Sequence, residues 1–263
     1  MLEKEVKVTW QENTENLLVK TCAECGFPIE PFISPVTGRI LCPVCPCEIE
    51  KETLERKRLF DQQKKAKLDY LFAGCAIGEA LPAADLEGFV ERPGTEDAYA
   101  AVMEYVKNLP DMIEKGQGLI IVGPPGCGKS HLVSAVANKV REAGYSVLFE
   151  RAPKLLMRLR SAYNSKSRVC ELELFEALGR VDLLVIDDLG AEKRTDWSEQ
   201  TIYTVIDERY ASGRATLITT NLSLEELEEK VGERTMDRLI GSCRIIENRA
   251  SSYRQERAGQ LKG

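Results

Sequence analysis

The stretch IIVGPPGCGKSHLV, residues 120–133, is the most informative segment of this 263-residue chain. It contains the pattern GPPGCGKS, whose glycines let backbone N–H groups turn toward phosphate oxygens. The apolar run GLIIV directly precedes this pattern and predicts a buried strand. The segment HLVSAVANKV at the end of the loop places its apolar residues on one helical face. A strand, a phosphate-binding loop and a helix in this order predict a nucleotide-binding α/β fold.

Residues of this loop, a Walker A motif, have separate expected roles. We expect Lys129 to reach the outer phosphates of ATP and Ser130 to ligate Mg²⁺. The residues expected to line the nucleotide are Gly123, Pro124, Pro125, Gly126, Cys127, Gly128, Lys129, Ser130 and His131.

A second motif, VDLLVIDDLG at residues 181–190, predicts the other half of the site. Its apolar strand ends in two carboxylates at the carboxyl edge of a parallel sheet, where ligands collect. We expect Asp187 to hold Mg²⁺ through a water molecule and Asp188 to orient the attacking water. Asp188 is one methylene shorter than the Glu usually found there, so slow hydrolysis is expected.

The strand ATLITTN, residues 215–221, ends in a polar group, Asn221. Asn221 either contacts the γ-phosphate or the lytic water, or caps the helix that follows. The motif order favours the first role. Residues 146–150 and 244–248 predict two more strands, so five short strands alternate with helices. This pattern predicts a three-layer α/β fold with a five-stranded parallel sheet.

The N-terminal cysteines predict a zinc ribbon. Two CxxC pairs are separated by a turn-rich segment, and the predicted ligands are Cys22, Cys25, Cys42 and Cys45. Cys47 could replace Cys45 as the fourth ligand. The single histidine, His131, lies in the phosphate loop, so an all-cysteine site is expected. A module this small needs a bound metal to fold.

The remaining sequence predicts the domain organisation. Residues 48–72 contain no Pro or Gly and predict one long helix. We therefore expect a zinc-ribbon module at 1–47, a helical linker at 48–73 and an ATPase domain at 74–263. No apolar run is long enough to span a bilayer and the N-terminus has no apolar signal core, so a cytoplasmic protein without a membrane partner is expected.

The motifs GPPGCGKSHL, LLVIDDLG, WSEQTIYTVIDERYASG, LITTNLSLEEL, GERTMDRL and SSYR follow one another between Gly123 and Arg254. In this order they resemble the bacterial DnaC/DnaI-type helicase loaders and their IstB transposition-helper relatives. The resemblance implies an AAA+ ATPase body that self-associates and binds single-stranded DNA, and an N-terminal domain that binds the replicative helicase. The cysteine module resembles the zinc-containing helicase-binding domain of the DnaI branch.

The resemblance also implies roles for three arginines. Arg238 would be the arginine finger that completes a neighbouring subunit's ATP site, with Arg234 as the second candidate. The alternative for these arginines is surface ion pairing with Glu233 or Asp237. Arg254 would be the sensor II arginine, approaching the nucleotide from a short tail instead of a helical lid.

Single-stranded DNA binding would depend on a local basic patch, because the net charge of −6 opposes binding through bulk charge. The candidate segment, residues 152–178, contains Lys154, Arg158, Arg160, Tyr163, Lys166 and Arg168. An amphipathic helix pair with a solvated basic face is an equal alternative.

Together these features predict an ATP-dependent helicase loader in DNA replication, with ATP, Mg²⁺ and Zn²⁺ as cofactors and slow, oligomer-dependent ATP hydrolysis. Two alternatives remain. One is an IstB-like transposition helper, and the other is a zinc-ribbon adaptor that uses ATP only as a binding switch.

Overall fold

The structure is a computed structural model that describes residues 19–74, 84–164 and 168–260. The chain divides into two compact units, Met1–Lys64 and Lys65–Gly263. In the described part of the chain, none of the helices combines the length and the apolar character needed to cross a membrane.

The first unit contains two short antiparallel hairpins. Strand β1 (Lys20–Thr21) pairs with β2 (Pro28–Ile29), and β3 (Phe32–Ile33) pairs with β4 (Ile40–Leu41). Helix α1 (Pro46–Gly74) follows, and it contains the single long helix predicted over residues 48–72.

The second unit is built around a five-stranded parallel sheet. Its strand order is β6-β7-β8-β5-β9. The strands are β5 (Gly118–Val122), β6 (Val147–Arg151), β7 (Leu183–Asp187), β8 (Ala215–Thr220) and β9 (Cys243–Glu247). The predicted five-stranded parallel sheet is therefore confirmed.

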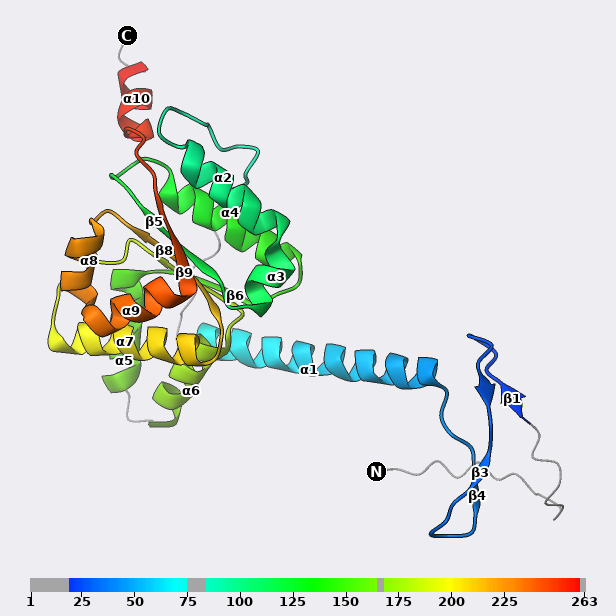
Figure 1. The fold of residues 1–263 in the computed structure, drawn as a ribbon. Helices are drawn as coiled ribbons and strands as arrows, with labels where there is room; N and C mark the ends of the chain where they lie inside the picture. Colours follow the sequence, from blue (N-terminus) through cyan, green and yellow to red (C-terminus); the bar gives the residue numbers. More distant parts are fainter. Residues whose placement is uncertain (1–18, 75–83, 165–167, 261–263) are drawn as a thin grey trace. The chain divides into compact units, whose positions relative to one another are not determined.

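Helices cover both faces of this sheet and make the second unit a three-layer structure (Figure 1). One face carries α2 (Glu96–Lys107), α3 (Leu109–Glu114) and α4 (Lys129–Glu142). The other carries α5 (Ala152–Asn164), α6 (Arg168–Arg180), α7 (Asp196–Ala211), α8 (Leu224–Val231) and α9 (Glu233–Ser242). Helix α10 (Tyr253–Gln260) follows β9.

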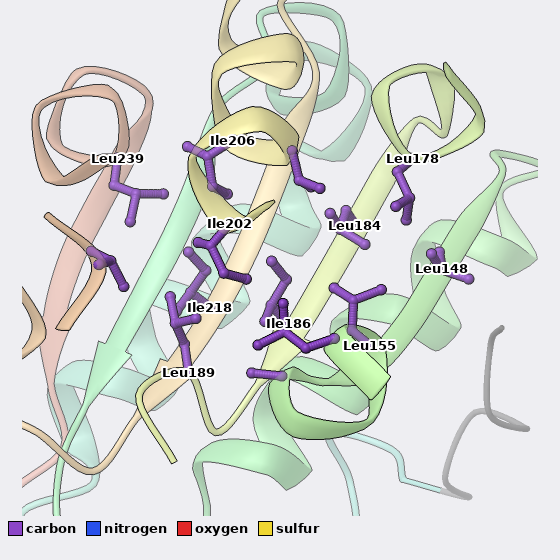
Figure 2. Packing of buried hydrophobic residues seen from close by; sticks show 14 of the residues in the cluster. Leu148, Leu155, Leu178, Leu184, Ile186, Leu189, Ile202, Ile206, Ile218 and Leu239 are labelled. Atoms are coloured by element: carbon purple, nitrogen blue, oxygen red, sulfur yellow. The ribbon is translucent and has the colours of Figure 1, made fainter. Parts of the chain in front are cut away.

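The core consists of two hydrophobic clusters separated by the sheet. In β7, Leu184 and Ile186 face the cluster with α5–α9, whereas Leu183 and Val185 face the cluster with α2–α4. Figure 2 shows Leu184 and Ile186 of β7 in the cluster that also contains Ile202 of α7. Because successive strand residues point to opposite faces and both faces are covered, every residue of the central strands β7 and β8 is buried.

Candidate nucleotide-binding site

The predicted phosphate-binding residues meet at the carboxyl ends of three adjacent strands, β7, β8 and β5. A pocket of about 280 Å³ lies there. Its lining includes the expected residues Pro125, Gly126, Gly128, Lys129, Ser130, His131, Asp188, Asn221 and Arg254. Gly123, Pro124 and Cys127 belong to the same loop but do not line the pocket.

Lys129 lies almost completely buried in the loop, where neutral oxygens surround its ammonium group. Lys129 Nζ donates to the carbonyl oxygens of Gly123 at 2.8 Å and Pro124 at 2.9 Å. It also donates to Asn221 Oδ1 at 2.8 Å. Burial lowers the pKa of Lys129. A phosphate oxygen would compensate this buried cation better than neutral carbonyls do.

A hydroxyl and a carboxylate form a candidate Mg²⁺ site. Ser130 Oγ donates to Asp187 Oδ1 at 2.8 Å, and Thr219 Oγ1 donates to the same oxygen at 2.6 Å. Asp187 is buried, and Arg151 Nε lies 3.9 Å from its other carboxylate oxygen. Hard oxygen ligands of this kind suit Mg²⁺, which is held through few carboxylates together with phosphates.

Asp188 follows the strand in a left-handed backbone conformation with φ of 57°. Its N–H donates to Thr219 Oγ1 at 2.9 Å, while Asn221 Nδ2 donates to Asp188 Oδ1 at 3.2 Å. Helix α8 is capped by Ser223, whose side chain accepts from the backbone N–H of Glu226. Asn221 is therefore not the helix cap, and it links Lys129 to Asp188 in the pocket.

One wall of the pocket was not predicted from the sequence. Gly88, Phe89, Val90 and Arg92 line it together with Tyr253. Phe89 stacks on Tyr99 with ring centroids 5.5 Å apart. A Cβ at Gly128, where φ is 107°, would approach the Phe89 ring to 2.8 Å, so the loop can pass this ring only with glycine there. In the sequence, the one indication of this wall is the aromatic residue Phe89 within the segment EGFVERPG, which has no helical or strand period.

The two candidate finger arginines lie on α9 and do not line this pocket. Arg238 Nε lies 3.0 Å from Asp207 Oδ1, and Arg238 Nη1 lies 3.1 Å from Asp237 Oδ2. Its guanidinium also lies 5.0 Å from the Tyr210 ring centroid. Arg234 is exposed, and its side chain forms no hydrogen bond or ion pair with the described residues.

Four thiols of the first unit form a candidate metal centre. The sulfur atoms of Cys22, Cys25, Cys45 and Cys47 all lie within 4.8 Å of one another. Tetrahedral Zn²⁺ with Zn–S bonds of about 2.3 Å places its sulfurs about 3.8 Å apart, so the group fits zinc. Backbone N–H groups of Cys25 and Glu24 lower the pKa of the Cys22 thiol to about 6, which favours the metal-binding thiolate.

The structure does not bring the predicted ligand Cys42 into this group, where Cys47 takes its place. Cys42 is exposed directly after β4. Helix α1 begins at Pro46, and the Cys45 carbonyl accepts from the N–H groups of Glu48 and Ile49. Because Cys47 lies in the first helical turn, its Sγ comes to 3.3 Å from that of Cys45. The sequence left open that Cys47 replaces Cys45 as the fourth ligand. In the structure Cys47 instead takes the place of Cys42, and Cys45 stays in the group.

Some basic side chains of the candidate DNA-binding segment, residues 152–178, contact other parts of the protein. Arg158 Nη1 lies 2.8 Å from Oε2 of Glu150, which is fully buried at the end of β6. Arg160 is exposed, with its guanidinium 5.0 Å from the Trp197 ring centroid. Arg158 therefore anchors α5 to the sheet. Lys166 and the side chains of Tyr163 and Arg168 lie outside the described residues.

Comparison with known proteins gives consistent matches to one group. The IstB-like ATP binding protein family matches residues 94–260. Replicative helicase loader DnaC of Escherichia coli K12 is 31% identical over 172 residues, which are 65% of this chain and 69% of that protein. The protein of the same name from Buchnera aphidicola subsp. Baizongia pistaciae is 29% identical over 209 residues, 79% and 84% of the two chains.

A solved structure agrees with these matches. The crystal structure of the DnaC helicase loader superposes with a TM-score of 0.57 at 26% identity, covering 64% of this chain and 98% of that one. The AAA+ fold that the motif resemblance implied is thereby confirmed.

Proposed function

The chain belongs to the family of IstB-like ATP binding proteins, and from this membership we propose that it is an ATP-dependent helicase loader of DNA replication. One observation carries the proposal. A complete phosphate pocket with Lys129, Asp188, Asn221 and Arg254 lies in a chain that matches proteins named replicative helicase loaders over most of its length.

ATP binding would begin with replacement of the oxygens around Lys129. The β- and γ-phosphates take the place of Asn221 Oδ1 and the loop carbonyls at Nζ, while backbone N–H groups of the loop hold the phosphate oxygens. Ser130 and Asp187, which share a hydrogen bond of 2.8 Å, would hold Mg²⁺, and the ion would neutralise charge on the outer phosphates. The apolar wall of Phe89 and Val90 suits the adenine base.

Hydrolysis would use two further side chains of the pocket, Asp188 and Asn221. Asp188 accepts a proton from, or orients, the attacking water, and Asn221, already bonded to Asp188, fixes that water beside the γ-phosphate. Arg254 lines the same pocket and would neutralise charge on the outer phosphates.

The finger arginine would come from a neighbouring subunit. Arg238 and Arg234 lie on α9, away from the pocket of their own chain, so they serve ATP hydrolysis only in trans. Asp207 and Tyr210 hold the Arg238 guanidinium in place, which preorganises a cation on the surface. We therefore expect isolated subunits to hydrolyse ATP slowly and assembled subunits to hydrolyse it faster.

ATPase rates measured against protein concentration test this arrangement. Arg238→Ala should abolish the rise with concentration and lower the rate at high concentration by about 1,000-fold, the size typical for a finger arginine. ATP affinity should remain unchanged. Arg244→Ala removes an exposed ion pair with Glu104 and serves as the matched control. If Arg238→Ala hydrolyses ATP normally at high concentration, Arg238 is not the arginine finger, and either Arg234 has this role or no arginine acts in trans.

The N-terminal unit would bind the helicase through its zinc-stabilised hairpins, as in the branch that its cysteines resemble. The thiol group of Cys22, Cys25, Cys45 and Cys47 supports zinc binding. Single-stranded DNA would contact the exposed part of α5, with Arg160 as the best described candidate, because Arg158 is paired with Glu150.

The family match itself favours a second candidate, an IstB-like helper of transposition. A pull-down with the zinc-loaded full chain separates the two functions. Retention of a hexameric helicase supports the loader, and retention of a transposase on duplex DNA supports the helper. An adaptor that uses ATP only as a switch would bind its partner in the presence of ATP and show no product in a single-turnover assay with single-stranded DNA.

A further inference from the structure

The C-terminal segment that carries Arg254 lies across the phosphate-binding loop. The Tyr253 N–H donates to the Gly126 carbonyl at 3.0 Å, and Asn248 Nδ2 donates to the Cys127 carbonyl at 3.2 Å. Gly126 has φ of 83°, and a Cβ there would clash with the Ser252 side chain. The loop and the segment therefore pass each other at backbone contact distance.

Arg92 joins these two parts of the chain. Its Nη1 donates to the Ser251 carbonyl at 3.0 Å and to Glu256 Oε2 at 3.0 Å. Its Nη2 donates to the Cys127 carbonyl of the loop at 3.4 Å. The guanidinium also lies 5.1 Å from the Tyr253 ring centroid. One side chain thus contacts residues on both sides of Arg254 and the loop beneath it.

The backbone around Arg92 is itself held firmly. Arg92 N–H donates to Thr95 Oγ1 at 2.9 Å, and the Thr95 hydroxyl donates back to the Arg92 carbonyl at 2.7 Å. The Gly94 carbonyl accepts from Arg249 N–H at 2.9 Å. The Arg92 side chain is only 11% exposed, so its fork of donors is fixed in direction.

Little else holds the segment beyond Ser252. Every described side chain from Tyr253 to Ala258 is exposed, so α10 has no apolar face packed into the core. A short helix without such packing is marginal in water. The contacts of Arg92 and the Gly126 carbonyl are therefore the ones that decide where Arg254 lies.

From this geometry we propose that Arg92 is a positioning residue that holds segment 251–256 on the phosphate loop, so that Arg254 faces the bound triphosphate. The inference rests on the proposed binding of ATP. It assigns to Arg92, which precedes α2, the role of keeping this segment against the phosphate loop. Arg92 acts on the nucleotide through Arg254.

A double-mutant cycle separates this role from a direct contact between Arg92 and the nucleotide, whose pocket it also lines. ATP affinity is measured by calorimetry for the wild-type chain, Arg92→Ala, Arg254→Ala and the double variant. Each single variant should weaken ATP binding about tenfold, as for loss of one charge-assisted contact. The double variant should bind no worse than Arg254→Ala. Additive losses would overturn the inference in favour of direct contact.

A second readout does not depend on ATP. Trypsin cleaves after Arg254 and Arg257, and mass spectrometry of the released C-terminal peptides reports how firmly the segment is held. Without nucleotide, Arg92→Ala should release these peptides at least several-fold faster than the wild-type chain. Arg92→Lys should be intermediate, because one ammonium group cannot reach Glu256 and both carbonyls together. Arg244→Ala should behave as wild type.

The outcomes distinguish the two claims. Unchanged proteolysis in Arg92→Ala overturns the docking of the segment, whatever the ATP affinity. A wild-type chain that binds no ATP overturns the proposed function and the link to the triphosphate, while faster proteolysis would still support the docking. Equal thermal stability of Arg92→Ala and wild type shows that the effect is local.

Discussion

Two adjacent carboxylates of the nucleotide site have different surroundings. Asp187 is buried and accepts from Ser130 and Thr219 hydroxyls, so its carboxylate is fixed where a metal ion can bind. Asp188 turns away from the strand through its left-handed backbone and meets Asn221 in the pocket. This difference supports the proposal that Asp187 binds the metal ion and Asp188 orients the water.

Asp188→Asn tests that assignment. Asn tolerates the same left-handed conformation, so the fold should be unchanged. Loss of the carboxylate should lower kcat about 100-fold or more, the usual contribution of a general base, with ATP affinity within about twofold of wild type. Steady-state kinetics and calorimetry measure both values. Asp187→Asn is the comparison, since it should weaken Mg²⁺-dependent ATP binding. Parallel loss of affinity in Asp188→Asn would contradict the division of roles.

At the scale of elements, a buried arginine of α7 joins two helices and the sheet. Arg209 is 1% exposed. Its Nη1 donates to the carbonyl of Leu178, in the last turn of α6, at 2.6 Å and to that of Val181, directly after the helix, at 2.9 Å. Its Nε donates to Thr216 Oγ1 of β8 at 3.0 Å. Carbonyls at a helix end have no partner within the helix, and Arg209 supplies one.

Arg209→Met should therefore destabilise the sheet domain. Methionine fills much of the volume but leaves several buried carbonyls without donors, which should lower the free energy of unfolding by about 3 kcal/mol. Urea unfolding followed by circular dichroism measures the change. Arg180→Ala, which removes an exposed ion pair with Glu176, should cost less than about 1 kcal/mol. Equal effects of the two substitutions would show that the buried donors are not needed.

At the scale of the whole molecule, the chain consists of two units with separate sources of stability. The sheet domain has two hydrophobic clusters, whereas the first unit has two-residue strands and many exposed apolar side chains, including Phe27, Phe32 and Val36. Because the described part of this unit buries so little surface, we expect its fold to depend on the proposed zinc ion.

Cysteine substitutions test both the ligand set and the independence of the units. Cys47→Ser should lower bound zinc well below one ion per chain and unfold the first unit, while Cys42→Ser, at an exposed thiol outside the group, should retain full zinc content. Atomic emission spectroscopy measures the zinc. ATP affinity should be equal in both variants, because the pocket lies within the second unit. Zinc loss in Cys42→Ser instead would restore the paired CxxC ligand set.

The parts of this protein that local pattern alone predicted are those whose contacts lie close together in the chain or repeat along it. The Walker A loop, the five short strands and the long helix over 48–72 are of this kind, and all are present in the structure. A glycine-rich turn, a run of apolar residues or a helical period acts over a few residues, so the residues themselves reveal it.

Three features depended on the tertiary structure. Cys47 joins the thiol group in place of Cys42 because α1 begins at Pro46. Arg158, which the sequence shows only as a basic residue, pairs with buried Glu150. Arg92 meets Ser251 and Glu256, 159 and 164 positions away. The Arg92 contacts arise only when the folded sheet brings distant loops to one edge, because no local pattern in the sequence indicates them.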